Sequence, residues 1–325
     1  MSAQNQLTAA QSTLSAIRAE LHKTIVGQNS VIDDLLAGFL AGGNCLLVGV
    51  PGLAKTLLVK SLAECLHLSF NRVQFTPDLM PSDITGSEIL FEDRVSGHRE
   101  FRFVNGPVFC NILLADEINR TPPKTQSALL QAMQEQAVTC GGKTYSLPDP
   151  FWVLATQNPI EQEGTYPLPE AQQDRFMFSI DVGYPDFESE VEIVKRTTGA
   201  ASPEVVPVVT AGDISVLRAL IRDLPVADSV ISFAVRMARA TRPEGGECPA
   251  DVIRHLSWGA GPRASQFLIL AAKSYALLDG RPTPDTRDVV RASLPVLRHR
   301  IIRSFNAEAD GVSVESIIST IVGHL

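Results

Sequence analysis

Short apolar runs and helix-like segments alternate through the first half of the chain. Several of the apolar runs contain almost no polar position, which is typical of strands covered by helices on both faces. The expected strands are Cys45–Val48, Phe70–Phe75, Asn111–Ala115, Phe151–Thr156 and Phe176–Val182. Helix-like segments lie around them, notably at Leu7–Thr24, Leu53–His67 and Lys124–Gln136. Because strands that alternate with helices pair in parallel, the pattern predicts a parallel α/β sheet.

Two segments depart from this alternation and have the pattern of β-hairpins. Residues Ser87–Val104 carry apolar residues at alternating positions on both sides of a turn-like stretch, Asp93–Gly97. Residues Gln136–Leu147 place Gly141 and Gly142 between two short strand-like runs. Paired glycines between such runs favour a tight turn, so we expect two hairpin insertions.

The second half of the chain has a different character. A stretch rich in proline and charge, Pro185–Pro207, leads into a region where only helical patterns are visible. We therefore place a boundary near Tyr184, with an α/β unit over residues 1–184 and a linker and all-α unit over residues 185–325. The expected helices are Asp213–Asp223, Ala227–Thr241, Ala264–Leu278, Thr286–Leu297 and Val314–Leu325.

Composition agrees with a two-domain globular protein. The chain has 325 residues, of which 45% are hydrophobic and 20% charged, and its formal net charge is −8. The acidic balance disfavours a dedicated nucleic-acid binder, which is usually basic. The five cysteines are scattered without a CxxC pair, which suggests reduced thiols and a cytoplasmic protein.

One uncharged run, Leu35–Ala54, is long enough to be mistaken for a membrane span. Its glycines and Pro51 divide it into a helix end, a turn and a short strand, so we expect no transmembrane segment. The N-terminus is polar and lacks the basic and then apolar pattern of a signal peptide.

The uncharged run ends in a candidate phosphate-binding loop, Gly49–Thr56 (GVPGLAKT). The loop follows a buried strand and precedes a helix, as a P-loop requires. Its backbone N–H groups and the helix N-terminus would face phosphate oxygens. Lys55 would neutralise the phosphates and the Thr56 hydroxyl would bind Mg²⁺. Ala54 stands where glycine is usual, and we expect it to fit without strain if its φ is negative.

Two more strand ends carry candidate chemistry. Asp116 and Glu117 follow the apolar run Asn111–Ala115, and in a parallel sheet they would lie at the ligand-binding edge. Asp116 would serve the Mg²⁺ shell and Glu117 would activate water, provided that the backbone turns between them. Asn158 follows the next strand and would orient the water, or form an Asx-type turn before Pro159.

Taken in order, these motifs resemble the AAA+ ATPases, and more closely the MoxR family. The resemblance extends from about Ile17 to the C-terminus. The segments that carry it are Val26–Gln28, Gly49–Thr56, Gln74–Gly86, Leu114–Gln126, Ala155–Glu163, Leu168–Phe176 and Gly261–Arg263.

The resemblance implies a role for each matching residue. Asp116 and Glu117 match Walker B, and Asn158 matches sensor 1. Arg175 resembles the arginine finger that reaches a neighbouring subunit's nucleotide, and Arg263 matches sensor 2 on a helical lid. The two hairpins correspond to the helix-2 insertion and the pre-sensor-1 hairpin. The nucleotide contacts implied are Val26, Gly27, Gln28, Gly49, Val50, Pro51, Gly52, Leu53, Ala54, Lys55, Thr56, Leu57, Asp116 and Arg263, with Mg²⁺ held by Thr56 and Asp116.

Other readings of the arginines stay open. Arg175 could instead pair with Asp174 or Glu170, and Arg263 could be a surface charge of the lid. Arg120 competes with Arg175 for the role across the subunit interface. A basic C-terminal group, Arg298, Arg300 and Arg303, is expected to form a solvated or intersubunit face.

The resemblance also implies what the protein does. It predicts a cytoplasmic, Mg²⁺-dependent ATPase that forms a homo-oligomeric ring, expected to be a hexamer, and remodels a protein client. MoxR-like proteins are associated with von Willebrand factor A-domain proteins and with metal insertion. Two alternatives are an ATP-sensing module without turnover and a DNA-acting motor. No motif names the client.

Overall fold

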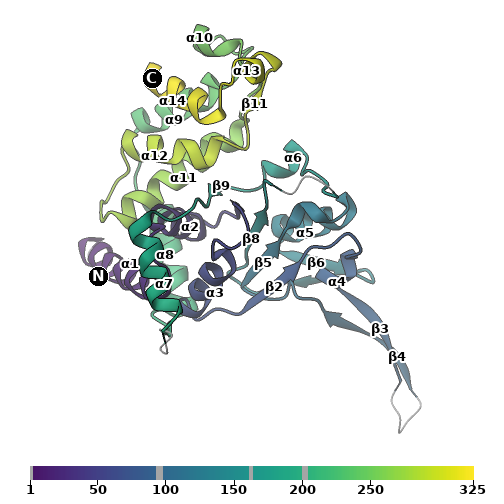
Figure 1. The fold of residues 1–325 in the computed structure, drawn as a ribbon. Coiled ribbons are helices and arrows are strands. Elements are labelled where there is room, and N and C mark those ends of the chain that lie inside the picture. The colour runs from purple at the N-terminus through teal and green to yellow at the C-terminus, as the bar shows by residue number, and fades with distance from the viewer. Residues whose placement is uncertain (1–2, 93–97, 161–163, 200–203) are drawn as a thin grey trace.

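The computed structural model describes residues 3–92, 98–160, 164–199 and 204–325 (Figure 1). Its centre is a parallel five-stranded sheet with the strand order β2-β5-β8-β1-β9. All five strands form where the apolar runs predict them. Their bounds are β1 Cys45–Val48, β2 Phe70–Gln74, β5 Ile112–Asp116, β8 Trp152–Gln157 and β9 Phe178–Asp181.

Helices cover both faces of this sheet, which explains why its central strands β5, β8 and β1 contain so few polar residues. Alternate residues of β5 divide between two hydrophobic clusters, with Ile112 and Leu114 in one and Leu113 and Ala115 in the other. The first cluster includes residues of α1 (Ala3–Thr24), α2 (Asn29–Ala41) and α3 (Lys55–Cys65). The second includes residues of α4 (Pro81–Thr85) and α5 (Pro123–Glu135).

The uncharged run Leu35–Ala54 is divided as its glycines predict. It supplies the end of α2, a left-handed turn at Gly42 (φ 75°), the strand β1 and the following loop. Within the described ranges, no helix has both the length and the apolar character needed to cross a bilayer.

Both predicted hairpins are present. Strands β3 (Gly86–Glu92) and β4 (Arg99–Asn105) form an antiparallel ribbon that projects from the body of the molecule (Figure 1). The turn expected at Asp93–Gly97 lies outside the described residues. Strands β6 (Ala137–Cys140) and β7 (Lys143–Ser146) form the shorter hairpin. The two hairpins pack together, since the rings of Phe103 and Tyr145 stack with centroids 4.2 Å apart.

The second half is mainly helical, as predicted, with one addition. Two strands of three and two residues, β10 (Leu256–Trp258) and β11 (Ile302–Arg303), pair antiparallel. Strands this short show no periodicity, so only helices were expected there. The other elements are α7 Phe187–Thr197, α8 Ala211–Asp223, α9 Asp228–Ala240, α10 Ala250–Ile253, α11 Pro262–Leu278, α12 Thr286–Leu297, α13 Phe305–Ala309 and α14 Val314–His324, besides α6 Glu170–Gln173 and η1 Ile118–Arg120 in the first half.

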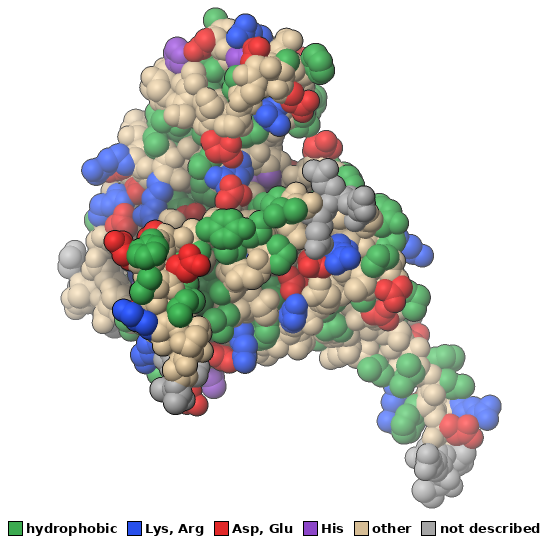
Figure 2. Space-filling view, in the orientation of Figure 1, with side chains coloured by type: hydrophobic (Ala, Val, Ile, Leu, Met, Phe, Trp, Pro, Cys, Tyr) green, Lys and Arg blue, Asp and Glu red, His purple; other side chains and the backbone are tan. Residues whose placement is uncertain are grey.

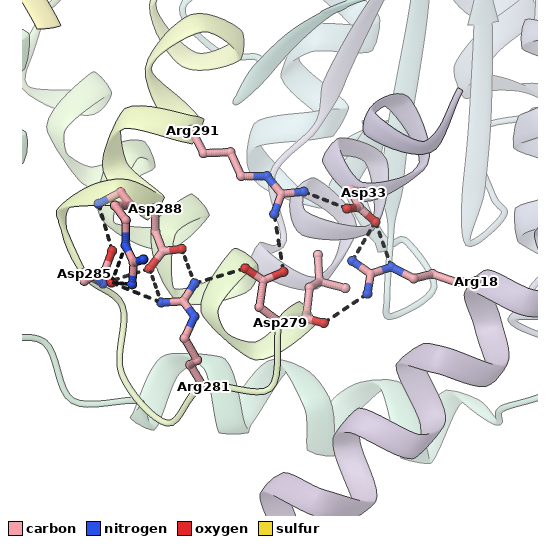
Figure 3. A network of polar contacts seen from close by, with 9 residues as sticks. Arg18, Asp33, Asp279, Arg281, Asp285, Asp288 and Arg291 are labelled. Atoms are coloured by element: carbon pink, nitrogen blue, oxygen red, sulfur yellow. Dashed lines mark hydrogen bonds and ion pairs between the residues drawn. The ribbon is translucent and has the colours of Figure 1, made fainter. Parts of the chain in front are cut away.

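A chain of ion pairs joins the helical unit to the sheet-containing unit (Figure 3). Asp33 on α2 accepts hydrogen bonds from Arg18 on α1 and from Arg291 on α12, at 2.7 Å each. Arg291 also pairs with Asp279, which pairs in turn with Arg281. The first hydrophobic cluster extends across both units. Because one hydrophobic core contains residues from both units, the core does not mark a domain boundary near Tyr184. That boundary stays a prediction.

The basic C-terminal group is not a solvated face. The Arg300 side chain is only 2% exposed and pairs with Asp174 at 2.8 Å. Its guanidinium also donates to the carbonyls of Asp174 (2.9 Å) and Phe176 (2.6 Å). Arg298 pairs with Asp181. The expectation was wrong for these two residues because a single sequence shows the charges but hides the carboxylate and carbonyl partners that allow their burial.

Asp34 on α2, where the two units meet, predicts that the stability of the fold depends on pH. Its carboxylate accepts a 2.6 Å hydrogen bond from the Tyr275 hydroxyl of α11. Burial raises the pKa of Asp34 to about 6, against the opposing effects of Tyr275 and Arg291. Since this pKa lies above the value of an unfolded aspartate, the group's contribution to stability is present below about pH 4 and is lost as the pH rises through 6.

We therefore expect Asp34→Asn to be progressively more stable than the wild type as the pH rises from 5 to 7. The difference in free energy of unfolding should grow by about 1 to 2 kcal/mol over this interval. Denaturant unfolding of both proteins at several pH values measures it. A difference in free energy of unfolding that is constant from pH 5 to pH 7 would contradict a raised pKa of Asp34.

Candidate active site

Three adjacent strands bring the predicted motifs to one edge of the sheet. In a parallel sheet all strand ends of one kind meet, and β5, β8 and β1 are neighbours. The loop Gly49–Thr56 follows β1, Asp116 ends β5, and Asn158 follows β8. The carboxyl edge of the sheet therefore gathers the phosphate loop, both acids and the sensor 1 candidate.

The loop is tightly constrained at its start and ends in a helix. A Cβ at Gly49 would lie 2.6 Å from the Val182 carbonyl oxygen, so only glycine fits there. Helix α3 begins at Lys55. The Lys55 ammonium group donates to the carbonyl oxygens of Gly49 and Val50, the latter at 2.9 Å. Burial lowers its pKa, while the charges of Asp116 and Glu117 act in the opposite direction.

Ala54 does not meet the condition of negative φ under which it was expected to fit without strain. Its φ is 56° and its ψ is 21°, which is the left-handed region, and it is the residue immediately before α3. A side chain in this conformation costs about 1 kcal/mol compared with glycine. The loop therefore keeps the backbone shape that glycine would adopt, because the strand and the helix on either side determine it.

Asp116 and Glu117 take different directions because the backbone turns between them, as their proposed roles require. Asp116 ends the strand, while Glu117 has φ 57° and ψ 50° and leads into η1. Leu114 and Asp116 share one face of β5, and Leu114 packs in the cluster that contains α3. Asp116 therefore lies on the face of the sheet that α3 and its loop cover.

Both acids are held by side chains that the sequence reasoning did not single out. Asp116 Oδ1 accepts a hydrogen bond from Thr156 Oγ1 at 2.5 Å, and Asp116 Oδ2 accepts two from Arg72. Gln74 Nε2 donates to Glu117 Oε2 at 2.7 Å. Period-2 alternation along β2, which pairs with β5, is the signal that could have identified Arg72 and Gln74 as neighbours of the acids.

Asn158 and the segment Val26–Gln28 are placed as follows. Asn158 is buried, and its Oδ1 accepts a hydrogen bond from the Ile160 amide at 3.2 Å, which is an Asx-type turn.

Gly27 and Gln28 both have positive φ, between α1 and α2. A Cβ at Gly27 would lie 2.8 Å from Ser189 Oγ, so this segment packs against α7. Their nucleotide roles stay predictions.

The structure does not bring Arg175 and Arg263 to the phosphate loop. Arg175 lies three residues before β9, whose first residue pairs with Cys45 at the start of β1. Both arginines line one small pocket with Asn44, which precedes β1. They are therefore at the amino edge of the sheet, whereas the loop follows the carboxyl end of β1. Arg263 therefore does not lie beside the phosphate loop of its own chain, and its contact with nucleotide stays a prediction.

The alternatives for the arginines are partly resolved. Asp174, one of the two partners considered for Arg175, pairs instead with Arg263 at 2.6 Å and with Arg300. Arg263 is thus more than an unpartnered surface charge of the lid. Arg120 pairs with Glu117 of its own chain at 3.1 Å.

Comparison with known proteins assigns the family. The model of the ATPase family associated with various cellular activities (AAA) matches residues 44–178, and that of the AAA lid domain matches residues 251–321. The chain is 45% identical to Chaperone MoxR1 of Mycobacterium tuberculosis, over 95% of this chain and 81% of that protein. It is 30% identical to Protein MoxR of Methylorubrum extorquens, over 87% and 85% of the two chains.

A solved structure supports the same assignment. The crystal structure of a protein from Cytophaga hutchinsonii, assigned as an ATPase, superposes with a TM-score of 0.90 at 42% identity and covers 99% of this chain and 97% of its own. Its fold is the one described here, including the helical second half. The chain is therefore an AAA ATPase and belongs to the MoxR family.

Proposed function

We propose that the protein hydrolyses ATP at the carboxyl edge of its sheet. The observation that carries this proposal is the junction of β5 and η1, where the left-handed backbone of Glu117 turns this acid away from its neighbour Asp116 beside a P-loop. The loop amides and the N-terminus of α3 bind the phosphates. Lys55 leaves the carbonyls of Gly49 and Val50 to contact phosphate oxygens. Glu117 accepts a proton from the attacking water, which Asn158 helps to orient.

The residues also fit a magnesium ion. Mg²⁺ prefers oxygen ligands and is usually held by one or two protein groups together with phosphates and water. The Thr56 hydroxyl on α3 and the Asp116 carboxylate, on the face of the sheet that α3 covers, offer this donor set. When bound, the ion would stabilise negative charge on the transferring phosphoryl group.

The position of Arg175 and Arg263 supports a ring. Guanidinium groups suit phosphate oxygens, yet these two lie at the edge of the sheet opposite their own loop. In a head-to-tail ring, the amino edge of one subunit can face the carboxyl edge of the next. We therefore propose that Arg175 acts across the interface, that Arg263 contributes there too, and that the ring is a hexamer.

The hairpins are the proposed contact with a protein client. The β3–β4 ribbon extends from the body and carries exposed apolar side chains on its described residues (Figures 1 and 2). Phe101 is 70% exposed and Leu90 is 55% exposed. Exposed apolar groups of this kind are typical of protein-binding surfaces. The name of the mycobacterial relative, a chaperone, agrees with remodelling of a client, for which a von Willebrand factor A-domain protein and a metal-dependent complex are candidates.

We place the protein in the cytoplasm, in line with its five free cysteines.

Phosphate release from ATP by the purified chain tests the proposal. Release is expected in Mg²⁺ and should fall to background when EDTA removes the ion. A protein that binds ATP in Mg²⁺ without releasing phosphate, as an assembled ring, would favour the ATP-sensing alternative. Stimulation by nucleic acid with strong salt dependence would favour the DNA-acting motor.

A further inference from the structure

Three hydrogen bonds occupy most of the Asp116 carboxylate in this structure, and both of those to Oδ2 come from Arg72. Asp116 Oδ1 accepts one hydrogen bond, from the hydroxyl of Thr156, which comes from the neighbouring strand β8 and is itself buried. Its Oδ2 accepts from Arg72 Nε at 2.9 Å and from Arg72 Nη2 at 2.7 Å. A carboxylate oxygen has about two lone-pair directions, so these two N–H groups fill Oδ2. The Mg²⁺ shell can use this oxygen only after Arg72 has released at least one bond.

Arg72 is placed where it can both hold Asp116 and leave it. It lies on β2, the edge strand of the sheet, and the register pairs it with Leu114, two residues before Asp116. The alternation of side chains along a strand therefore puts Arg72 and Asp116 on one face. The Arg72 side chain is 47% exposed. An edge strand has no hydrogen-bonded strand on its outer side, and this exposure gives the side chain room to turn into water.

We propose that Arg72 competes with Mg²⁺ for Asp116 and so sets the affinity of the site for the metal–nucleotide complex. This inference rests on the proposed ATPase site. Without nucleotide, the guanidinium neutralises a carboxylate that is mostly buried. On binding of Mg²⁺ and nucleotide, Arg72 would release Asp116 Oδ2, which would then be available to the metal shell. Arg72 Nη2 also donates to Gln74 Oε1 at 2.8 Å, which gives the released side chain a partner on its own strand.

Competition predicts an effect on affinity that appears only when the metal is present. Arg72→Ala removes the competitor, so it should strengthen nucleotide binding in Mg²⁺ and leave binding in EDTA unchanged. Because a half-exposed ion pair contributes up to about 1 kcal/mol, the expected gain in Mg²⁺ is about fivefold or less. Arg72→Lys keeps the charge but loses the forked contact, so its gain should be smaller and in the same direction.

Titration of the full chain with a fluorescent, non-hydrolysable ATP analogue, in Mg²⁺ and in EDTA, measures both affinities. Arg239→Ala is the matched control, since it breaks an exposed pair with Glu247 (2.7 Å) on the helical unit and should change neither value. Equal effects of Arg72→Ala in Mg²⁺ and EDTA, or weaker binding in Mg²⁺, would overturn the inference alone. A wild-type chain that binds no nucleotide in Mg²⁺ would overturn the proposed ATPase site and the inference together.

Discussion

Glu117→Gln is expected to lower the rate of ATP hydrolysis by about 10²- to 10⁴-fold while nucleotide remains bound. The amide is nearly the same size as the carboxylate but cannot accept a proton from water. The left-handed backbone at Glu117 is unaffected by the change, and Asp116 keeps its own partners, Thr156 and Arg72. Steady-state phosphate release together with nucleotide titration separates the lost chemistry from retained binding.

Asp116→Asn is the contrasting variant for this experiment. It weakens the metal site, so it should reduce nucleotide binding in Mg²⁺ as well as hydrolysis. If Glu117→Gln released phosphate at the wild-type rate, Glu117 would not be the base and the proposed mechanism would be wrong. If both variants lost nucleotide binding equally, the two acids would not have separate roles, although the backbone turn at Glu117 points their side chains in different directions.

A hydrolysis-deficient ring that keeps ATP should also retain its client. A pull-down with Glu117→Gln is therefore expected to enrich a partner that the wild type releases during turnover. Adding Phe101→Asp places a charge on the exposed β3–β4 ribbon, far from both acids, and should abolish the enrichment. Retention of the same partner by the double variant would show that the client binds elsewhere.

The sequence predicts well the sheet and the meeting of its motifs at the carboxyl edge, because these features depend on local patterns. Strands such as Ile112–Asp116 are buried on both faces, so their apolar runs are continuous and their ends are marked by the first acids. The loop Gly49–Thr56 is recognisable because glycine is required where the backbone approaches Val182. Neighbouring parallel strands then bring the loop and the acids together without further information.

The features that escape prediction depend on contacts distant in the sequence. Arg300 is charged like a surface residue, yet Asp174, 126 positions earlier, and nearby carbonyls hold it in the interior. Arg72 and Gln74 gain their importance only from the pairing of β2 with β5. Ala54 is a different case, since its left-handed backbone immediately before α3 is one that the propensity of alanine does not predict.

Arg175→Ala is expected to reduce hydrolysis by about 10³-fold or more in the assembled ring, since an arginine supplied across an interface stabilises the charge of the transition state. Nucleotide binding should change much less, because the phosphate loop with its Lys55 is intact in this variant and the arginine acts mainly on charge that develops in the transition state. Size-exclusion chromatography of the variant with nucleotide verifies that the ring still forms. A variant that forms rings and hydrolyses ATP normally would make Arg175 a structural residue and leave Arg263 as the candidate.

Mixing two inactive variants decides whether Arg175 acts on its own chain or on the next. A chain with Arg175→Ala keeps Glu117, and a neighbour with Glu117→Gln keeps Arg175, so their shared interface restores a complete site. In equal mixture with random assembly, about a quarter of the interfaces would have this composition, and activity should recover to that extent. An arginine that serves its own chain gives no recovery, because every chain then lacks one of the two groups. Recovery would therefore require the ring and would place the active site between two copies of the chain.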